Sequence, residues 1–248
     1  MENKARIQKV LSDQGILSRR RTEELIKEGR ITVNGRPAQP GHPIDIRRDI
    51  VAIDGERVWF QKKKKNYYVM LHKPRGYVTT MSDEKGRRSV ADLVADFPVR
   101  LYPVGRLDKE SRGLILMTNQ GELVNRILRG SERHEKEYLV QVDRPVTAEF
   151  LRKMASGLYL PDLDRTTRPC QVRRRGRNGF YIVLTQGWNR QIRRMCEACG
   201  YRVKDLQRIR IMNLLLGELP EGAYREVTEA EFAGLMRELE KTGGSRSV

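Results

Sequence analysis

The hydrophobic positions near the N-terminus predict two short helices. Apolar residues spaced i, i+3, i+4 form one helix face within residues 7–11, and Gly15 interrupts that pattern. Ser18 is a suitable N-cap for a second helix over about residues 19–28, and Gly29 is a suitable C-cap. The pattern therefore predicts a helical pair at the start of the chain.

Two strand-and-turn signals follow these helices. Ile31–Val33 leads into Asn34-Gly35, and Val51–Ile53 leads into Asp54-Gly55. Asn-Gly and Asp-Gly favour tight hairpin turns because their residues readily adopt positive φ. With the helices, they predict a compact module over residues 1–61.

The rest of the chain mixes strand and helix patterns. The strand candidates are Tyr67–Leu71, Leu114–Met117, Tyr138–Val142 and Phe180–Thr185. The helix candidates are Val90–Asp96, Gly121–Leu128, Thr147–Ala155, Arg190–Cys199 and Thr228–Leu239. Residues 165–177 contain six Arg and no acidic residue, which predicts a basic loop or hairpin.

The chain carries a large net positive charge, which indicates the kind of partner that it binds. The 248 residues include 49 Lys and Arg against 32 Asp and Glu, a formal net charge of +17. Such an excess favours a polyanion, most often nucleic acid. Residues 1–66 hold 16 basic and 9 acidic residues, so +7 of the charge lies in this first segment. The segment ends in the basic run 62–66, which we interpret as a solvated linker between two domains.

Composition also argues against several protein classes. The longest apolar and aromatic run, Tyr67–Leu71, is far shorter than the ~20 residues that a membrane span needs. The first residues lack the apolar stretch of a signal peptide. Three cysteines imply no disulfide framework and fit a reducing compartment. We therefore expect a cytoplasmic protein without membrane binding.

Cys196 and Cys199 have the spacing of half a zinc site. At helical spacing, however, they share an apolar stripe with Ile192 and Met195. Structural zinc needs about four ligands, and neither Cys170 nor the three histidines show a partnering spacing. We interpret the cysteine pair as core packing and expect no metal.

The segment V-G-R-L-D-K-E-S-R-G-L-I-L-M-T-N, residues 104–119, carries the strongest functional signal. It places Asp108 in a loop bounded by glycines, directly before an apolar strand. In isolation, Asp108 could equally cap a turn or pair with a neighbouring Arg. The complete string is more specific, because it resembles the catalytic loop of the RsuA-type pseudouridine synthases.

Other segments resemble the same family in the same order. L-H-K-P-R-G-Y at Leu71–Tyr77 is similar to the start of the family's catalytic domain. K-E-Y-L-V at Lys136–Val140 is similar to the segment with its active-site Tyr, and G-W-N-R-Q-I-R-R-M at Gly187–Met195 to the segment with its active-site Arg. The first part of the chain, with S-R-R-R-T-E-E-L-I-K-E-G-R-I-T-V-N-G, resembles an S4 RNA-binding domain. The resemblance covers roughly residues 4–235.

Within that family, the chain looks most like the RluF branch, which acts on large-subunit ribosomal RNA. The similar strings are H-E-K-E-Y-L-V, N-R-Q-I-R-R-M-C-E and R-I-R-I-M-N. Ser111 stands where the broader family usually has Thr, and both side chains carry a hydroxyl.

The resemblance implies an α+β fold with two domains. We expect an S4-like RNA-binding domain over 1–61, the linker over 62–66 and a pseudouridine synthase catalytic domain over 67–240. The catalytic domain would have a largely antiparallel mixed sheet, flanking helices and two subdomains around a cleft. A disordered tail is expected over 241–248.

The resemblance also implies a reaction and its residues. Uridine is flipped out of its stack, the N1–C1′ bond breaks, and C5 joins C1′, without a cofactor. Asp108 would be the catalytic carboxylate, Tyr138 would stack on uracil and assist proton removal from C5, and Arg193 would form a salt bridge that keeps Asp108 ionised.

RNA contacts are expected from basic residues in both domains. Arg106 would fill the gap left by the flipped base, and Lys73 and Arg190 would bind substrate near the catalytic motifs. Arg19 and Arg20 begin the second helix, where basic side chains and backbone N–H groups can meet phosphate.

The expected substrate is large-subunit ribosomal RNA, and the expected enzyme is a monomer with no DNA partner. Small-subunit ribosomal RNA and transfer RNA remain alternative substrates. A non-catalytic S4-type RNA-binding or ribosome-assembly protein is the alternative from another class. Retention of Asp108, Tyr138 and Arg193 together favours the enzyme.

Overall fold

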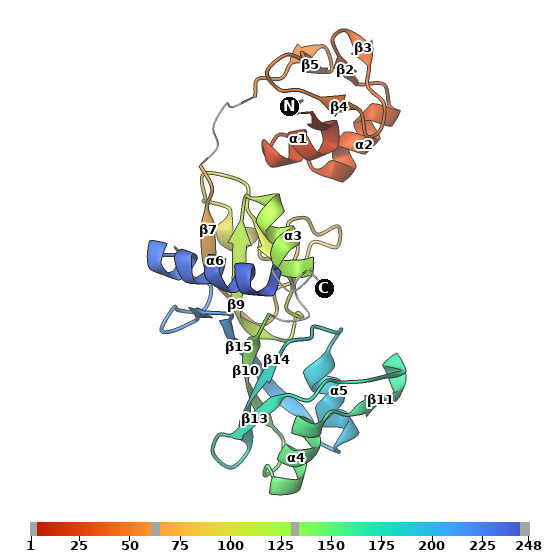
Figure 1. The fold of residues 1–248 in the computed structure, drawn as a ribbon. Helices are drawn as coiled ribbons and strands as arrows, with labels where there is room; N and C mark the ends of the chain where they lie inside the picture. Colours follow the sequence, from red (N-terminus) through yellow and green to blue (C-terminus); the bar gives the residue numbers. More distant parts are fainter. Residues whose placement is uncertain (1–3, 61–64, 130–133, 244–248) are drawn as a thin grey trace. The chain divides into compact units, whose positions relative to one another are not determined.

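The computed structural model describes residues 4–60, 65–129 and 134–243 of the chain. Its contacts divide into two compact units (Figure 1). The first comprises residues 1–66 together with Pro98–Arg100, and the second comprises Tyr67–Phe97 and Leu101–Val248. Of the expected linker, only Lys65 and Asn66 are described, and both are exposed.

The first unit packs two helices against short strands. Its helices are α1 (Ile7–Asp13) and α2 (Arg19–Lys27). Its strands are β1 (Ala5–Arg6), β2 (Ile31–Val33), β3 (Arg36–Pro37), β4 (Pro43–Ile44), β5 (Val51–Ile53) and β6 (Glu56–Arg57). Strand β1 pairs with β4, and the other four form a sheet in the order β3-β2-β5-β6. A core of buried aliphatic side chains from both helices and β2, β4 and β5 joins these elements.

Local sequence accounts for this module closely. The Ser18 hydroxyl accepts a 3.1 Å hydrogen bond from the Arg21 N–H, so it caps α2 as expected. Gly29 follows the helix with φ +71°, a conformation that glycine adopts at little cost. The two turns between β2 and β3 and between β5 and β6 have positive φ at both central residues, as their Asn-Gly and Asp-Gly sequences predict.

A nine-stranded mixed sheet forms the second unit. Its main path runs β13-β14-β10-β15-β9-β7-β17, with β16 beside β15 and β8 beside β9. These strands are β7 (Tyr68–Lys73), β8 (Tyr102–Val104), β9 (Arg112–Thr118), β10 (Lys136–Val142), β13 (Gln171–Arg174), β14 (Gly179–Leu184), β15 (Val203–Ile211), β16 (Leu214–Leu215) and β17 (Tyr224–Glu226). The β15–β9 pair is parallel and the other pairs are antiparallel. The expectation of a largely antiparallel mixed sheet is therefore confirmed.

Helices and a small hairpin flank this sheet. They are α3 (Gly121–Arg129), α4 (Ala148–Ser156), α5 (Gln191–Ala198) and α6 (Glu229–Gly243), with 3-10 turns at η1 (Asp92–Val94) and η2 (Pro161–Leu163). Strands β11 (Tyr159–Leu160) and β12 (Arg165–Thr166) pair separately. No helix of the described residues has the length and apolarity to cross a bilayer.

Two predicted element bounds and one tail bound need correction. The helix expected over Val90–Asp96 is only the short turn η1, in which the N–H groups of Asp92 and Val94 donate to the carbonyl oxygens three residues earlier. The helix expected from Arg190 begins one residue later, since Arg190 has φ +53°. Helix α6 continues to Gly243, so residues 241–243 are not part of a disordered tail, and 244–248 lie outside the described residues.

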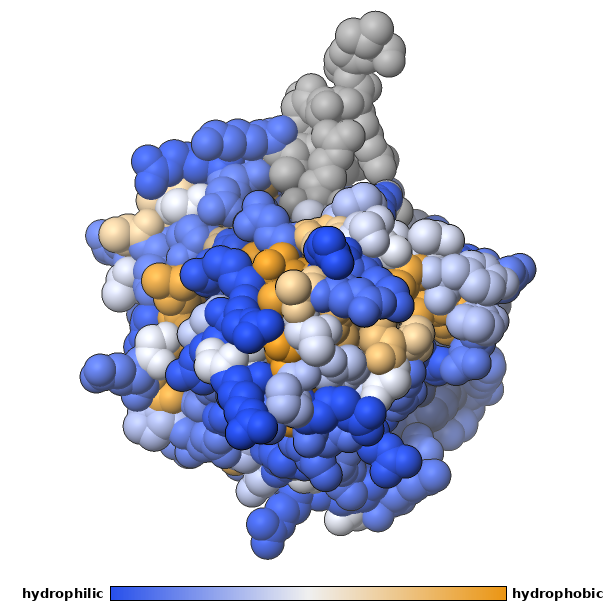
Figure 2. All heavy atoms as spheres, turned by 90° about the horizontal axis from the view of Figure 1, so that it is seen from below, coloured by the Kyte–Doolittle hydropathy of each residue, from blue (hydrophilic) through white to orange (hydrophobic). Residues whose placement is uncertain are grey.

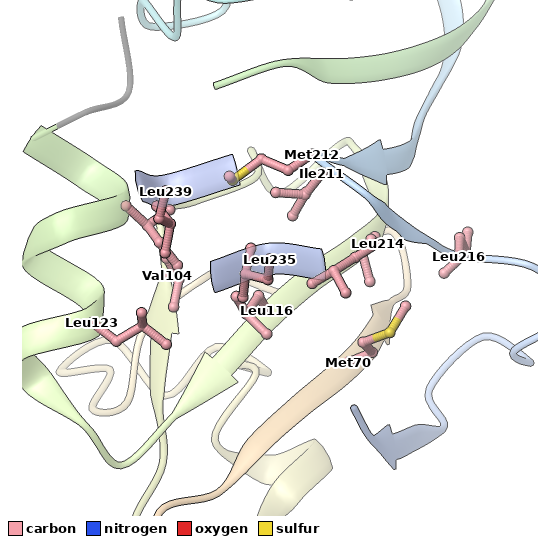
Figure 3. Packing of buried hydrophobic residues seen from close by; sticks show 12 residues of the cluster. Met70, Val104, Leu116, Leu123, Ile211, Met212, Leu214, Leu216, Leu235 and Leu239 are labelled. Atoms are coloured by element: carbon pink, nitrogen blue, oxygen red, sulfur yellow. The ribbon is translucent and has the colours of Figure 1, made fainter. Parts of the chain in front are cut away.

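Two groups of apolar residues hold the sheet to its helices. On one side, Leu235 and Leu239 of α6 pack toward Val104 and Leu116 of β8 and β9 (Figure 3). On the other side, the ring of Phe150 on α4 packs against Phe180 of β14 and against Tyr201, with ring centroids 5.3 and 4.1 Å apart, respectively. The two groups support the two halves of the sheet that meet at β10, β15 and β9.

The basic stretch and the cysteines also have defined places. Residues 165–177 contribute β12 and β13, and β13 forms a hairpin with β14 at the edge of the sheet. Hydrophilic residues dominate the face drawn in Figure 2. All three cysteines are free, and Cys196 is fully buried on α5, where burial raises the pKa of its thiol.

Candidate active site

The loop that carries Asp108 connects β8 to β9. These strands pair antiparallel from Tyr102↔Thr118 to Val104↔Leu116, so residues 105–111 close a hairpin. The Ser111 N–H donates a 3.0 Å hydrogen bond to the Asp108 carbonyl oxygen, which makes a tight turn. Asp108 is half-buried, whereas Leu107 before it is buried. The turn thus holds the carboxylate at the edge of the core.

Gly113 allows the start of β9 to approach β15 closely. Its φ is +113°, and a Cβ at this position would overlap the Arg208 carbonyl oxygen and lie 2.5 Å from the Arg208 nitrogen. Gly113 pairs with Arg208 in the parallel β9–β15 contact. A residue without a side chain is required here because the neighbour is backbone and cannot turn aside.

The side chains of Thr79 and Lys73 hold the Asp108 loop in place by hydrogen bonds to its backbone. The Thr79 hydroxyl donates to the Leu107 carbonyl oxygen at 2.7 Å and accepts from the Leu107 N–H at 3.1 Å. Lys73 Nζ donates 2.7 Å hydrogen bonds to the carbonyl oxygens of Pro74 and Ser111. The Lys73 side chain is fully buried, so the structure places it as a support of this loop, whereas the sequence suggested a substrate contact.

Burial also changes the acidity of Lys73. Desolvation lowers the pKa of its ammonium group to about 8, and the nearby negative charges of Asp108 and Glu110 oppose that shift. Burial of a charged group in a protein is costly unless it is paired or hydrogen-bonded. The two carbonyl acceptors and the Asp108 charge therefore favour the charged form of this lysine.

A cavity of about 870 Å³ opens beside the loop. Asp108 is the one carboxylate in its lining among the described residues. Six cationic side chains share the lining: Arg106, Lys136, Arg165, Arg168, Arg190 and Arg208. The walls come from both halves of the sheet, so the structure provides the cleft expected between two subdomains.

Tyr138 lies in the middle of β10 and contributes to the same cavity. Its exposed fraction is 9%. It pairs with Ile182 of β14 on one side and with Arg208 of β15 on the other. Two sheet neighbours fix its backbone, so its ring is presented to the cavity from a rigid element.

Arg193 occupies a different place from the one expected. It is buried on α5, and its Nη2 donates hydrogen bonds to the Glu110 carbonyl oxygen at 3.0 Å and to the Ser111 hydroxyl at 3.3 Å. Within the described chain, no ion pair of 4.0 Å or less joins it to Asp108. The guanidinium thus holds the Asp108 loop through hydrogen bonds to Glu110 and Ser111 and does not form the expected salt bridge.

The pKa of Arg193 reflects this position. Desolvation lowers it from the ordinary value, Arg190 lowers it further, and the Asp108 charge raises it. The structure leaves Arg193 Nε buried without a hydrogen-bond partner. Asp108 is therefore close enough to stabilise the Arg193 charge electrostatically, although the two groups make no direct ion pair.

The remaining expected RNA contacts fall into two places. Arg106 and Arg190 are exposed and line the cavity. Arg19 and Arg20 are exposed at the start of α2 in the first unit. No acidic residue stands in the first turn of α2, so the local charge there is positive.

Sequence reasoning missed two cations of the cavity. Arg208 is buried, and its Nε donates a 2.7 Å hydrogen bond to the Leu114 carbonyl oxygen. Lys136 donates to the His134 carbonyl oxygen at 3.0 Å, and burial, assisted by Arg208, lowers its pKa to about 8. Lys136 could have been found, because a residue two positions before Tyr138 shares its face of a strand.

Comparison with known proteins decides what this cavity belongs to. The family model described as RNA pseudouridylate synthase matches residues 67–198, and the S4 domain model matches residues 5–51. The chain belongs to the RNA pseudouridylate synthase family. It is an RNA pseudouridine synthase with an S4 domain, as the sequence motifs predicted.

Relatives extend this similarity along almost the whole chain. The dual-specificity RNA pseudouridine synthase RluF of Escherichia coli strain K12 is 42% identical over 97% of this chain and 81% of its own length. Ribosomal large subunit pseudouridine synthase B of Bacillus subtilis strain 168 is 35% identical over 93% and 95%, respectively. A solved pseudouridylate synthase is 27% identical, with a TM-score of 0.66 over 96% of this chain and 99% of that one.

A pseudouridine synthase isomerises uridine, which requires breaking and remaking a bond at C1′. The lining described above suits that reaction, because one carboxylate lies among several cations that can bind the sugar-phosphate chain.

Proposed function

We propose that this synthase modifies a uridine of large-subunit ribosomal RNA and that Asp108 is its catalytic carboxylate. The observation that carries the proposal is the position of Asp108 as the one carboxylate in the described lining of the cavity. Its loop is fixed by Thr79, Lys73 and Arg193. A fixed carboxylate beside a cavity is suited to act at a sugar carbon.

The chemistry follows from that placement. The target uridine leaves its stack and enters the cavity, and Asp108 assists cleavage of the N1–C1′ bond at the sugar. The uracil takes the bond electrons, turns, and forms the C5–C1′ bond. A proton then leaves C5 and another is taken up at N1, so that substrate and product have the same atoms and electrons. No redox partner is required for this isomerisation.

Tyr138 acts on the uracil in this proposal. Its ring stacks on the base, and its hydroxyl assists removal of the C5 proton. The rigid pairing of β10 with β14 and β15 supports that role by fixing the ring position. Replacement by Phe would retain the stacking surface and remove only the hydroxyl.

Arg193 serves as a positioning residue. Its hydrogen bonds to the Glu110 carbonyl and the Ser111 hydroxyl hold the residues just after Asp108. The negative charge of Asp108 in turn favours the charged form of Arg193. This role replaces the direct salt bridge that the sequence suggested.

The exposed arginines bind the RNA chain. Arg106 fills the gap left by the flipped base, and Arg190 contacts a phosphate at the cavity. Arg19 and Arg20 supply phosphate contacts from the S4 domain, which favour affinity more than sequence choice. We propose that the enzyme acts as a monomer in the cytoplasm, where ribosomal RNA is available.

The substrate proposal rests on relatives. The Bacillus subtilis relative is named for the large ribosomal subunit, and the Escherichia coli relative is named as a dual-specificity enzyme. Large-subunit ribosomal RNA is therefore the first substrate to test, with transfer RNA and small-subunit ribosomal RNA as the alternatives.

Release of tritium from RNA labelled at uracil C5 tests the proposal. Wild-type enzyme and Asp108→Asn are each incubated with transcripts of large-subunit ribosomal RNA, small-subunit ribosomal RNA and transfer RNA. We expect release only from the large-subunit RNA and only by wild type. Release from another transcript alone would refute the substrate, and equal release by the variant would refute the role of Asp108. If no RNA reacted, including partly assembled large subunits, the non-catalytic binding protein would be favoured.

A further inference from the structure

Trp188 shares the cavity with Asp108 and Tyr138, but the reaction gives it no task. It lies in the loop between β14 and α5 and is half-buried. A large aromatic side chain that is not part of the core, at a cavity that accepts RNA, requires an explanation.

A hydrogen-bond network fixes the Trp188 loop. The Trp188 N–H donates to Gln191 Oε1 at 3.2 Å, and the Gln191 N–H donates to the Trp188 carbonyl oxygen at 3.2 Å. Gln191 is buried, and its Nε2 lies 3.4 Å from Gln186 Oε1, which also accepts from the Arg168 N–H at 2.8 Å. The network therefore fixes Trp188 relative to the segment that follows β12.

The Arg165 side chain lies close to this ring. The Arg165 guanidinium carbon lies 5.8 Å from the centroid of Trp188, which is within the range of a cation–π contact. Arg165 and Arg190 are both exposed and line the cavity, and neither forms an ion pair within the part of the chain that the structure describes. These cations remain available for an anionic ligand.

An aromatic ring among unpaired cations has a specific chemical match. Proteins bind single-stranded nucleic acid by stacking bases on aromatic side chains while cations follow the phosphates. The cavity volume of about 870 Å³ lies toward the upper end of the roughly 300–1,000 Å³ typical of small-ligand sites. It therefore offers room for more than one pyrimidine ring.

We propose that Trp188 is the stacking platform for the nucleobase adjacent to the target uridine, and that Arg165 turns to the phosphate between the two nucleotides. This inference rests on the proposed function, because it takes Asp108 to mark the place of the target. Flipping of the uridine removes one stacking partner from the adjacent nucleobase, and the Trp188 ring gives that nucleobase a new stacking surface. The platform would thereby stabilise the flipped state.

Tryptophan fluorescence tests the stacking directly. The chain has two tryptophans, and the other, Trp59, is 74% exposed in the first unit. Trp59→Phe therefore leaves Trp188 as the single reporter. It is titrated with a nine-nucleotide oligouridylate and with an abasic ribose-phosphate chain of the same length. We expect quenching by the first and little change with the second, and Trp188→Phe provides the Trp59 signal as a control. Equal responses to both chains, or no quenching at saturation, would overturn the proposal.

Kinetics then place the stacked base beside the target. On the RNA that releases tritium, Trp188→Ala should raise KM about tenfold, because one stacked base is worth roughly that factor. Trp188→Phe keeps an aromatic ring and should therefore have a KM close to that of wild type. When the base adjacent to the target is removed from the RNA, wild type and Trp188→Ala should have similar KM values. A Trp188→Ala effect of the same size on intact and abasic RNA would show a merely structural role. If no RNA is modified, the proposed function fails, whereas the fluorescence result still decides the role of Trp188.

Discussion

The buried ammonium group of Lys73 donates a 2.7 Å hydrogen bond to the carbonyl oxygen of Ser111, three residues after Asp108. The two residues are 38 positions apart in the sequence and are joined by the β7–β9 pairing, which ends at Lys73↔Gly113. The Asp108 loop is thus tied to strand β7 by a charged side chain. This contact gives the loop a pH-dependent support.

Stability should depend on pH through Lys73. Its pKa falls from 10.5 in the unfolded chain to about 8 in the folded protein because the group is desolvated. Between about pH 8 and 10.5 the unfolded chain therefore binds more protons, so the free energy of unfolding rises with pH across that window. Urea denaturation at several pH values should show a steeper rise for wild type than for Lys73→Met.

Lys136 is a control for this comparison, because its pKa is also lowered to about 8 and it is present in both proteins. Its contribution cancels in the difference between wild type and Lys73→Met. Parallel stability curves for the two proteins over pH 8–10.5 would contradict the predicted titration of Lys73.

Gly113→Ala should strongly destabilise the catalytic domain. The new Cβ would meet the Arg208 backbone, and the residue would keep an unfavourable φ of +113°. We expect a loss on the order of 3 kcal/mol in the free energy of unfolding. Gly176→Ala is the matched control, since Gly176 has φ +65° but nothing within 4 Å of an added Cβ. Similar melting temperatures for the two variants would show that backbone contact does not matter.

Arg193→Ala should lower kcat without a comparable rise in KM for RNA. Loss of its bonds to Glu110 and Ser111 would let the Asp108 loop shift, and a displacement of about 1 Å can cost about 10²-fold in rate. Arg193→Lys keeps the charge and should recover part of kcat. Single-turnover assays over a range of RNA concentrations separate the two constants. A rise in KM alone would instead indicate that Arg193 contacts RNA.

Arg19→Ala combined with Arg20→Ala should weaken RNA binding and reduce its salt dependence. Each lost phosphate contact should lower the slope of log affinity against log salt by about 1. The value of kcat should remain near that of wild type. Arg47→Ala combined with Arg48→Ala removes the same charge from another exposed site of the first unit. Binding titrations at several salt concentrations that show equal losses for both pairs would assign the effect to net charge alone.

Local features of the sequence predicted the α-helices of this protein and strands β2, β5, β7, β9, β10 and β14, but not β8, β15 or β17. Ser18 and Gly29 bound α2, and the Asn-Gly and Asp-Gly pairs form the predicted turns. These features depend on backbone geometry within a few residues, so they are visible without a fold. The helix expected at Val90–Asp96 is instead a 3-10 turn, because its backbone N–H groups bond three rather than four residues back, which an apolar pattern does not reveal.

The motif around Asp108 and the S4-like segment also determined the family before any coordinates, and the family matches agree. Only the tertiary structure decided what the surrounding cations do. Lys73 and Arg193 looked like substrate and salt-bridge residues, yet both are buried behind the loop. Whether a charged side chain meets solvent, substrate or a backbone carbonyl depends on which strands become neighbours. That order, set by the β7–β9–β15–β10 pairing, depends on long-range packing rather than on local spacing.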